Sequence, residues 1–192
     1  MKNKALLFAS FIFMLFVSCD SSSVDESEPT TNFLSSKLKN LKINEVEKNT
    51  PNSSANGQGA IFLNYEGFVP GIQYFSFHAN TDVNGVVSGS FETKWGVNGR
   101  IHGTIDCLTT LSDGKTAILS GKVTQINGDG YINSGFLVGM NAWFKVQDNG
   151  EGANSSTDMF SDIYANFDPI LQCSFNLGVD MLTITNGNIQ VK

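Results

Sequence analysis

The placement of glycine constrains the fold more than any other feature of this sequence. All 19 glycines of the 192-residue chain lie between Gly57 and Gly187. Many occur with Asn or Asp in short clusters, such as Asn84-Gly85 and 127–130, between segments rich in Phe, Val and Ile. Such clusters form tight turns, because Gly adopts a positive φ without steric cost. The stretch therefore favours many short strands joined by turns.

Alternation of apolar and polar residues predicts the strands themselves. In 72–78, Phe75 and Phe77 fall on one face and the intervening polar side chains on the other. A strand over 86–93 completes a hairpin across the Asn84-Gly85 turn. Further strands are predicted over 100–108, 116–126, 135–147, 160–165, 171–175, 182–185 and 188–191. This spacing predicts an all-β fold, an antiparallel β-sandwich or flattened barrel.

The N-terminal segment predicts export. Lys2 and Lys4 precede an apolar run over 5–17. As a helix this run would span roughly 20 Å, which is short of the ~30 Å hydrocarbon core of a membrane. We therefore expect a signal peptide over 1–18 rather than a transmembrane helix.

Residues 19–57 are predicted to form a polar stalk before a β-domain over 58–192. The acidic, Ser-rich run after Cys19 and the polar tract 49–57 lack the apolar residues needed to build a core. Between these tracts, apolar residues recur at nearly helical spacing over 33–46. Two alternatives stay open there, a short amphipathic helix or a partly ordered linker.

The signal ends in Phe16-Val17-Ser18-Cys19, which resembles the lipobox of bacterial lipoproteins, with Phe16 standing where the family has Leu. The resemblance implies cleavage before Cys19 and attachment of acyl chains such as palmitate to this residue. Two or three chains hold a protein stably on a membrane. The composition and the acidic region after Cys19 favour the outer membrane or the cell surface over the inner membrane.

Four short runs in the β-domain carry a second resemblance: 103–108, 117–123, 144–152 and 187–191. They are similar to a small β-rich module of secreted and surface bacterial proteins. The resemblance implies an all-β fold and an extracellular setting. It implies no activity, because the function of that module is not settled.

Charge argues against a nucleic-acid partner. The chain has 12 Lys and Arg against 18 Asp and Glu, a net charge of −6. Loss of Lys2 and Lys4 with the signal would leave 10 basic residues and a charge of −8. A nucleic-acid binder needs a basic face to displace counterions from phosphate.

The residues that could carry catalysis lack a catalytic spacing. His78 shares a polar strand face with Tyr74 and Ser76, and His102 follows Arg100 on another strand. The chain has no HxH, HExxH, CxxC or GxSxG motif, so we expect surface or hydrogen-bonded histidines rather than a metal centre. A non-catalytic binding or adhesion module is favoured. An accessory subunit of an envelope complex and an extracytoplasmic hydrolase are the alternatives.

The sequence leaves open whether the partner is a glycan or a protein. Aromatic side chains that stack on sugars would favour a glycan, although such residues also pack in cores. The candidates for such a platform are Trp95, Trp143, Tyr65, Tyr74 and Tyr131.

An acidic loop over 148–158 suggests calcium. It gathers Asp148, Glu151 and Asp158, and carboxylate oxygens are the ligands that Ca²⁺ prefers. The alternative is a solvated turn whose Asp148 side chain bonds its own backbone.

Two cysteines remain if Cys19 carries lipid. Alternation places Cys107 on the face of Ile101 and Ile105, and Cys173 on the face of Leu171 and Phe175, so both are expected in the core. An exported protein can form a disulfide between Cys107 and Cys173, but two separate buried thiols fit the pattern equally well.

Overall fold

A computed structural model describes residues 42–45, 52–65, 69–96, 99–152 and 155–192. The predicted signal peptide, Cys19 and most of the predicted stalk lie outside these residues. The elements are β1 (Ile43–Glu45), β2 (Ser54–Leu63), β3 (Gly71–Thr81), β4 (Val87–Trp95), β5 (Gly99–Thr110), β6 (Thr116–Asn127), α2 (Asp129–Asn133), β7 (Asn141–Gln147), β8 (Met159–Phe160), β9 (Tyr164–Asn166), β10 (Phe175–Leu177), β11 (Leu182–Thr183) and β12 (Asn186–Val191).

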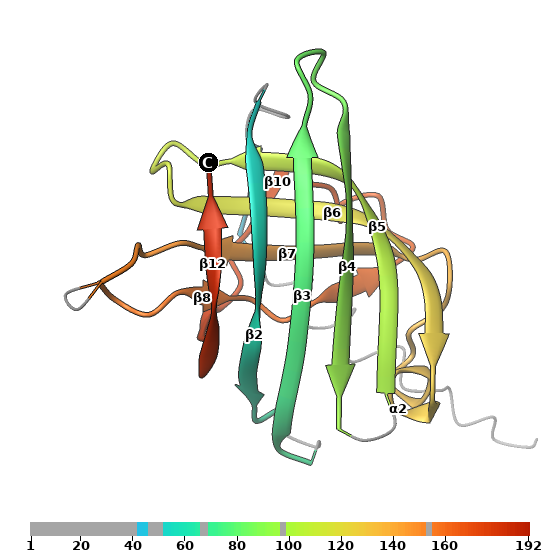
Figure 1. Ribbon diagram of the computed structural model, residues 1–192. Coiled ribbons are helices and arrows are strands. Elements are labelled where there is room, and N and C mark those ends of the chain that lie inside the picture. The colour runs from blue at the N-terminus through green and yellow to red at the C-terminus, as the bar shows by residue number, and fades with distance from the viewer. Residues whose placement is uncertain (1–41, 46–51, 66–68, 97–98, 153–154) are drawn as a thin grey trace, which may run out of the picture.

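The predicted all-β fold is confirmed. One antiparallel sheet has the order β11-β8-β7-β6-β5-β4-β3-β2-β12, with β9 on β7, and β1 and β10 form a separate two-stranded sheet. The large sheet curls into a half-barrel, so that β7 and β8 lie behind β2, β3 and β4 (Figure 1). The Asn84-Gly85 turn joins β3 and β4 as predicted, with Gly85 at a φ of 79°.

Phenylalanines from facing parts of the curled sheet fill its interior, here called the main core. Phe75 stacks on Phe160 with ring centroids 4.0 Å apart, and Phe77 and Phe91 each meet the ring of Phe144 edge-on. Each such pair contributes about 0.5–1.5 kcal/mol beyond simple burial. Gly103, opposite Phe91 on the next strand, leaves room for that ring, since a Cβ there would overlap it.

A second apolar cluster, here called the outer cluster, lies on the other side of β5, β6 and β7. The segment 167–181 covers these strands through Leu171, Cys173 and Leu177, which pack on Ile118 and Trp143. The Trp143 Nε1–H donates to the carbonyl oxygen of Phe175 at 3.1 Å. The segment crosses the large sheet without joining it, and its one strand is β10, which pairs with β1, so the strand predicted over 171–175 is misplaced. Its apolar alternation reflects packing against a covered sheet face.

The face assigned to Cys107 was also wrong. A register shift between Ile105 and Cys107 inserts a bulge into β5, which moves the following side chains to opposite faces. Ile101 and Ile105 therefore point into the main core, whereas Cys107 lies in the outer cluster.

Two other boundaries differ from the sequence prediction. The breaker over 127–130 leads into the short helix α2, whose Tyr131 is buried at the end of the main core. The predicted strand over 135–147 begins only at Asn141.

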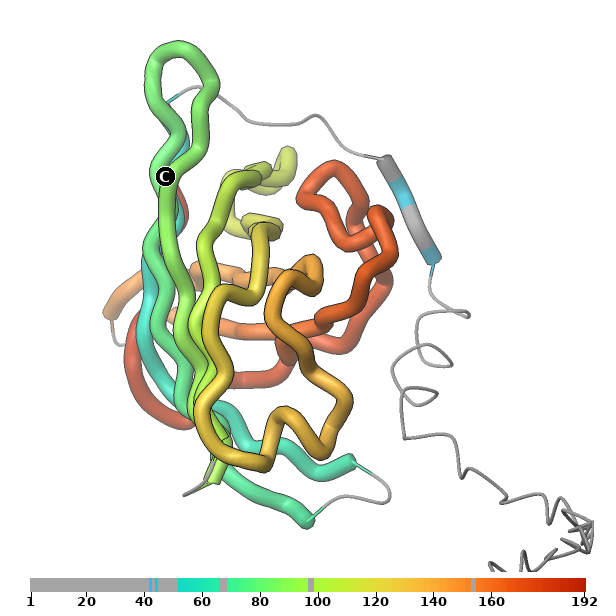
Figure 2. The backbone as a smooth tube through the Cα atoms, turned by 90° about the vertical axis from the view of Figure 1, so that its right-hand side faces the viewer, coloured from blue at the N-terminus to red at the C-terminus, as the bar shows by residue number. Residues whose placement is uncertain are grey.

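At the N-terminal side, the predicted domain boundary at residue 58 falls within β2. Within the stretch predicted to be a helix or a linker, Ile43–Glu45 forms strand β1 on β10. Figure 2 shows β1 on the opposite side of the molecule from the outward face of β2, β3 and β4. Within the described residues, no helix is long and apolar enough to cross a membrane.

Candidate functional site

The only arginine of the chain and both histidines gather on one surface. This surface, here called the outer face, is the side of β12, β2, β3, β4 and β5 that points away from the main core. His78 projects from β3, and Arg100 and His102 project from β5. Residue types that are rare in this sequence thus lie within three neighbouring strands.

Strand register aligns the polar side chains of the outer face into two rows that cross the strands and continue onto β6 and, for the first row, β7. Cross-strand pairs link every member of a row to the next. The first polar row is Gln190, Asn56, His78, Ser90, Thr104, Lys122 and Asn141. The second polar row is Asn188, Gln58, Ser76, Glu92, His102 and Gln125. Every member of both rows is at least partly exposed.

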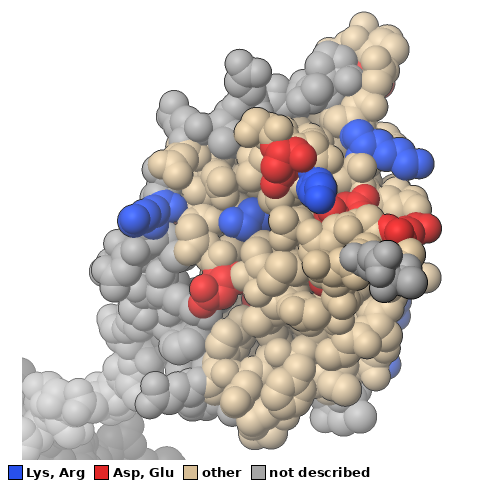
Figure 3. Space-filling model, turned by 90° about the vertical axis from the view of Figure 1, so that its left-hand side faces the viewer, with Lys and Arg blue, Asp and Glu red and all other residues tan. Residues whose placement is uncertain are grey.

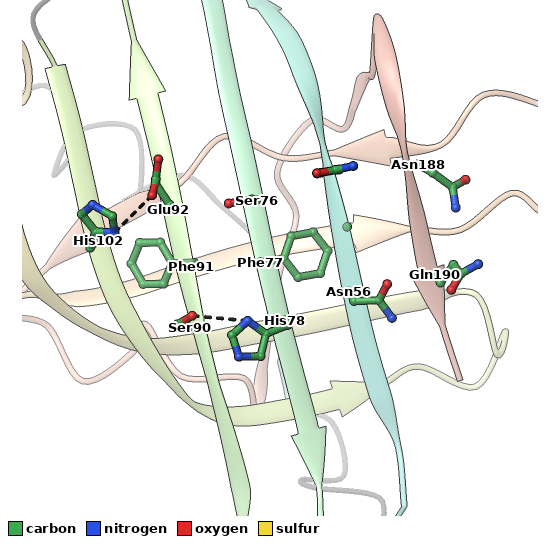
Figure 4. A pocket seen from close by; sticks show the side chains of 12 residues that line it. Asn56, Ser76, Phe77, His78, Ser90, Phe91, Glu92, His102, Asn188 and Gln190 are labelled. Atoms are coloured by element: carbon green, nitrogen blue, oxygen red, sulfur yellow. Dashed lines mark hydrogen bonds and ion pairs between the residues drawn. The ribbon is translucent and has the colours of Figure 1, made fainter.

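The two rows enclose a shallow depression of about 490 Å³ between β12 and β5, here called the first depression. The short side chains of Ser76 and Ser90 lie near its middle. Longer amides on β12 and β2 lie on one side, and His102 with Glu92 on the other (Figure 4). The depression exists because the short side chains of Ser76 and Ser90 leave the surface low between longer neighbours on the adjacent strands.

Glu92 holds Arg100 and His102 in place at the β5 side of the first depression. The Arg100 Nη2–H donates to Glu92 Oε2 at 2.6 Å, and His102 Nδ1 lies 3.3 Å from the same oxygen. The hydrogen bond from Arg100, with His102 and Lys94 nearby, holds the pKa of Glu92 below its usual range. Glu92 is therefore ionised at neutral pH and keeps an acceptor fixed on the surface.

The first depression offers hydrogen bonds rather than a catalytic constellation. Glu92 is the one carboxylate among the described residues that line it, whereas glycoside hydrolysis uses a facing pair. Ser90 Oγ and His78 Nδ1 are 3.3 Å apart. Both residues lie inside paired strands, where ladder bonds occupy the backbone N–H groups that an oxyanion hole would need.

Two further hollows lie on either side of the β5 end of the first. One of about 390 Å³, here called the second depression, contains Asp106, Lys122, Asn141 and Gln172. There the Lys122 ammonium donates to Asn141 Oδ1 at 2.6 Å. Another hollow of about 720 Å³ lies beyond Glu92 and contains Lys94 and Arg100.

The acidic loop lies against the edge strand β12. Asp158 is buried and accepts hydrogen bonds from the backbone N–H groups of Asn149 and Ile189. Asp148 accepts from those of Gly150 and Val191. The N–H groups of Ile189 and Val191 point away from β2, so the two carboxylates take the place of a further strand at this edge.

Glu151, the third calcium candidate, is next to the first depression instead. Its Oε1 accepts from the side-chain amides of Asn188 at 3.2 Å and Gln190 at 3.1 Å. These amides begin the two polar rows, so Glu151 positions them. Among the described residues, no group of three His, Cys, Asp or Glu side chains could hold a metal ion. A calcium site stays one of the two alternatives predicted for this loop, beside the solvated turn.

Of the two arrangements left open for the cysteines, the structure contains the disulfide. Cys107 on β5 is joined to Cys173 in the covering segment, 66 residues later in the sequence. The Cys173 N–H donates to Ser120 Oγ at 2.9 Å, which ties the same point to β6. The disulfide therefore fastens the segment 167–181 to the sheet.

The five aromatic residues considered as a sugar platform are not brought together on a surface. Trp143 and Tyr131 are buried, and Trp95 packs on the main core. Tyr74 is exposed, with 51% of its surface accessible to solvent, and it lies on the outer face beside the polar rows. Cross-strand partners Phe62 and Ile72 extend this exposed apolar end.

Seen from the β12 side, charged groups are sparse and of both signs on a largely uncharged surface (Figure 3). No family model, curated protein or solved structure matches the chain. The functional interpretation therefore depends on the outer face itself.

Proposed function

We propose that this protein is a lipid-anchored protein of the bacterial cell envelope whose β-domain binds a glycan without turning it over. One observation supports a glycan ligand above all: the first depression lies between two uninterrupted polar rows. Amides, hydroxyls, imidazoles and one fixed carboxylate supply donors and acceptors in close succession. Sugars, which carry hydroxyl groups on all sides, match such a surface.

A protein partner fits this surface less well. The cores of protein interfaces are depleted in charged residues and enriched in aromatic ones, whereas the middle of the first depression contains Ser76 and Ser90. Extended peptides commonly pair with a free sheet edge, and carboxylates of the acidic loop occupy the outward N–H groups of β12. An accessory role in an envelope complex remains the second candidate, supported by the exposed apolar end at Phe62 and Ile72.

The anchor is supported by the lipobox-like Phe16–Cys19 and by the polar tract after it. The position of β1, away from the outer face, would leave the first depression directed away from the attachment point. The outer membrane or the cell surface is the location in which such a display would reach extracellular glycans.

Binding is tested with the full-length protein, purified from membranes in a detergent that has no sugar headgroup and applied to a glycan array. We expect a response to at least one glycan class, and loss of that response in Ser76→Tyr, which fills the depression. Ser88→Tyr, on the outer face of β4 but outside the depression, is the matched control. Equal binding by Ser76→Tyr and the wild type would exclude this site.

The anchor is tested separately by metabolic labelling with a fatty-acid analogue. The wild type should incorporate label, and Cys19→Ala should not. Label retained by Cys19→Ala would show that the acyl chains, if any, are elsewhere.

A further inference from the structure

The first polar row continues well beyond the first depression. It crosses seven strands from Gln190 on β12 to Asn141 on β7, and each step is a direct cross-strand pair. Six steps at about 4.8 Å between strands give a path of about 29 Å. No apolar residue interrupts this path.

Both depressions lie on this one row. Gln190, Asn56, His78 and Ser90 contribute to the first, and Lys122 and Asn141 contribute to the second. The exposed side chain of Thr104 connects them, because it pairs with Ser90 on one side and with Lys122 on the other. The two hollows are thus successive parts of one continuous polar track.

The outer face changes from polar to apolar along β2 and β3, whereas it stays polar along β4 and β5. Along β3, the outer face changes from His78 and Ser76 to Tyr74 and then Ile72. The path that joins the two depressions runs across the strands, because Thr104 links them along the first polar row.

The track is curved. The sheet bends between β4 and β7, so the row passes from the face that is frontal in Figure 1 round the side that Figure 2 presents. A flat, rigid surface such as a crystalline polysaccharide could contact one depression but not both. A flexible chain in solution could follow the whole row.

We propose that the ligand is a soluble, flexible polysaccharide chain that lies across the strands along the first polar row and occupies both depressions. This inference depends on the proposed glycan binding. In this arrangement the first depression supplies the primary contacts. Lys122, whose ammonium is exposed beside Asn141, supplies contacts that only a longer chain reaches.

The test uses the detergent-solubilised full-length protein and the glycan class that responds most strongly on the array, as a size-graded series from the disaccharide upward. Calorimetry should show affinity rising at least about tenfold once the chain spans both depressions, because the second set of contacts is then intramolecular. The insoluble form of the same polymer should bind no more tightly than a short oligosaccharide.

Variants separate the two depressions. Lys122→Met should weaken the affinity for long chains about tenfold, which is the loss expected for one or two hydrogen bonds. It should leave the affinity for short chains unchanged. Lys115→Met, an exposed lysine of the β5–β6 turn, is the matched control. Affinity that does not depend on chain length, or equal effects of Lys122→Met on short and long chains, would overturn the extended track while leaving the first depression as a binding site. Absence of binding at every length would overturn both proposals.

Discussion

At the scale of single residues, carboxylates in this protein are acceptors for neighbouring groups. Glu92 accepts from Arg100 at the surface, Glu151 from two amides of β12, and Asp158 from two backbone N–H groups in a buried position. These three roles differ in burial, so they respond differently to substitution and to pH.

Glu92 should make stability and binding sensitive to acid. Its pKa in the folded protein is held below the unfolded value of about 4.3 by the hydrogen bond from Arg100. A depressed carboxyl pKa stabilises the fold fully above the unfolded value, and the contribution is lost as the pH falls through the folded value. The melting-temperature difference between wild type and Glu92→Gln should therefore be present at pH 6 and shrink below about pH 4.

Glycan affinity should follow the same window, because protonation releases Arg100 and removes a fixed acceptor. Glu92→Gln should bind more weakly at neutral pH and show no further loss across that range. If affinity falls at low pH in Glu92→Gln as it does in the wild type, the pH dependence belongs to another group.

Asp158 should matter most for stability. Replacement by Ala leaves the buried N–H of Ile189 and that of Asn149 without their acceptor, so we expect a loss of about 2–4 kcal/mol in urea unfolding. The control Asp106→Ala, at an exposed position, should change the free energy of unfolding by no more than about 0.5 kcal/mol.

The same loop decides the calcium question. Because both oxygens of Asp148 and of Asp158 already accept backbone hydrogen bonds, we expect equal melting temperatures in millimolar calcium and in chelator. A rise with calcium that Asp148→Ala abolishes would establish the metal site instead.

At the scale of elements, the disulfide should govern the covering segment. Cross-linking positions 66 residues apart stabilises a fold by about 2–5 kcal/mol. The double variant Cys107→Ala with Cys173→Ala should therefore unfold with a free energy lower by about 2–5 kcal/mol. Hydrogen exchange should increase over 167–181 and stay unchanged in β3 and β4. Uniform acceleration throughout the sheet would mean that the segment is not a separate unit.

Element identity was predictable wherever local pattern and pairing agree. The alternation in β3 and the Asn84-Gly85 turn both have local causes, and both were predicted. The bulge before Cys107 could not be predicted, because it depends on the register of β5 against β6. The covering segment around Leu171 alternates like a strand although it packs across a sheet, so its pattern alone was misleading.

The candidate site was harder to predict than the strands. His78, His102 and Arg100 were noticed as polar strand residues, but nothing in the sequence indicates that Asn56 or Gln190 lies beside them. A row across strands joins residues that are far apart in the chain, and its members become neighbours only once every register is fixed.

At the scale of the whole molecule, the outer face and strand β1 lie on opposite sides (Figure 2). If the lipid anchor and surface location proposed above hold, the outer face should be accessible from outside the cell. A membrane-impermeant maleimide should then label Ser90→Cys on intact cells. Labelling of Ser90→Cys only after lysis would place the domain on the inner side of the outer membrane.

The short pairing of β1 with β10 has a mechanical consequence for a tethered protein. Three residue pairs hold Ile43–Glu45, whereas β2 is paired along its length and its Ser54 exchanges two backbone bonds with Lys192. Tension between a membrane anchor and a captured ligand would therefore peel β1 away first. If the proposed anchor holds, residues 43–53 would then extend to at most about 36–40 Å before any force reaches the main sheet. The outer face would keep its shape while the chain before β2 lengthens under load.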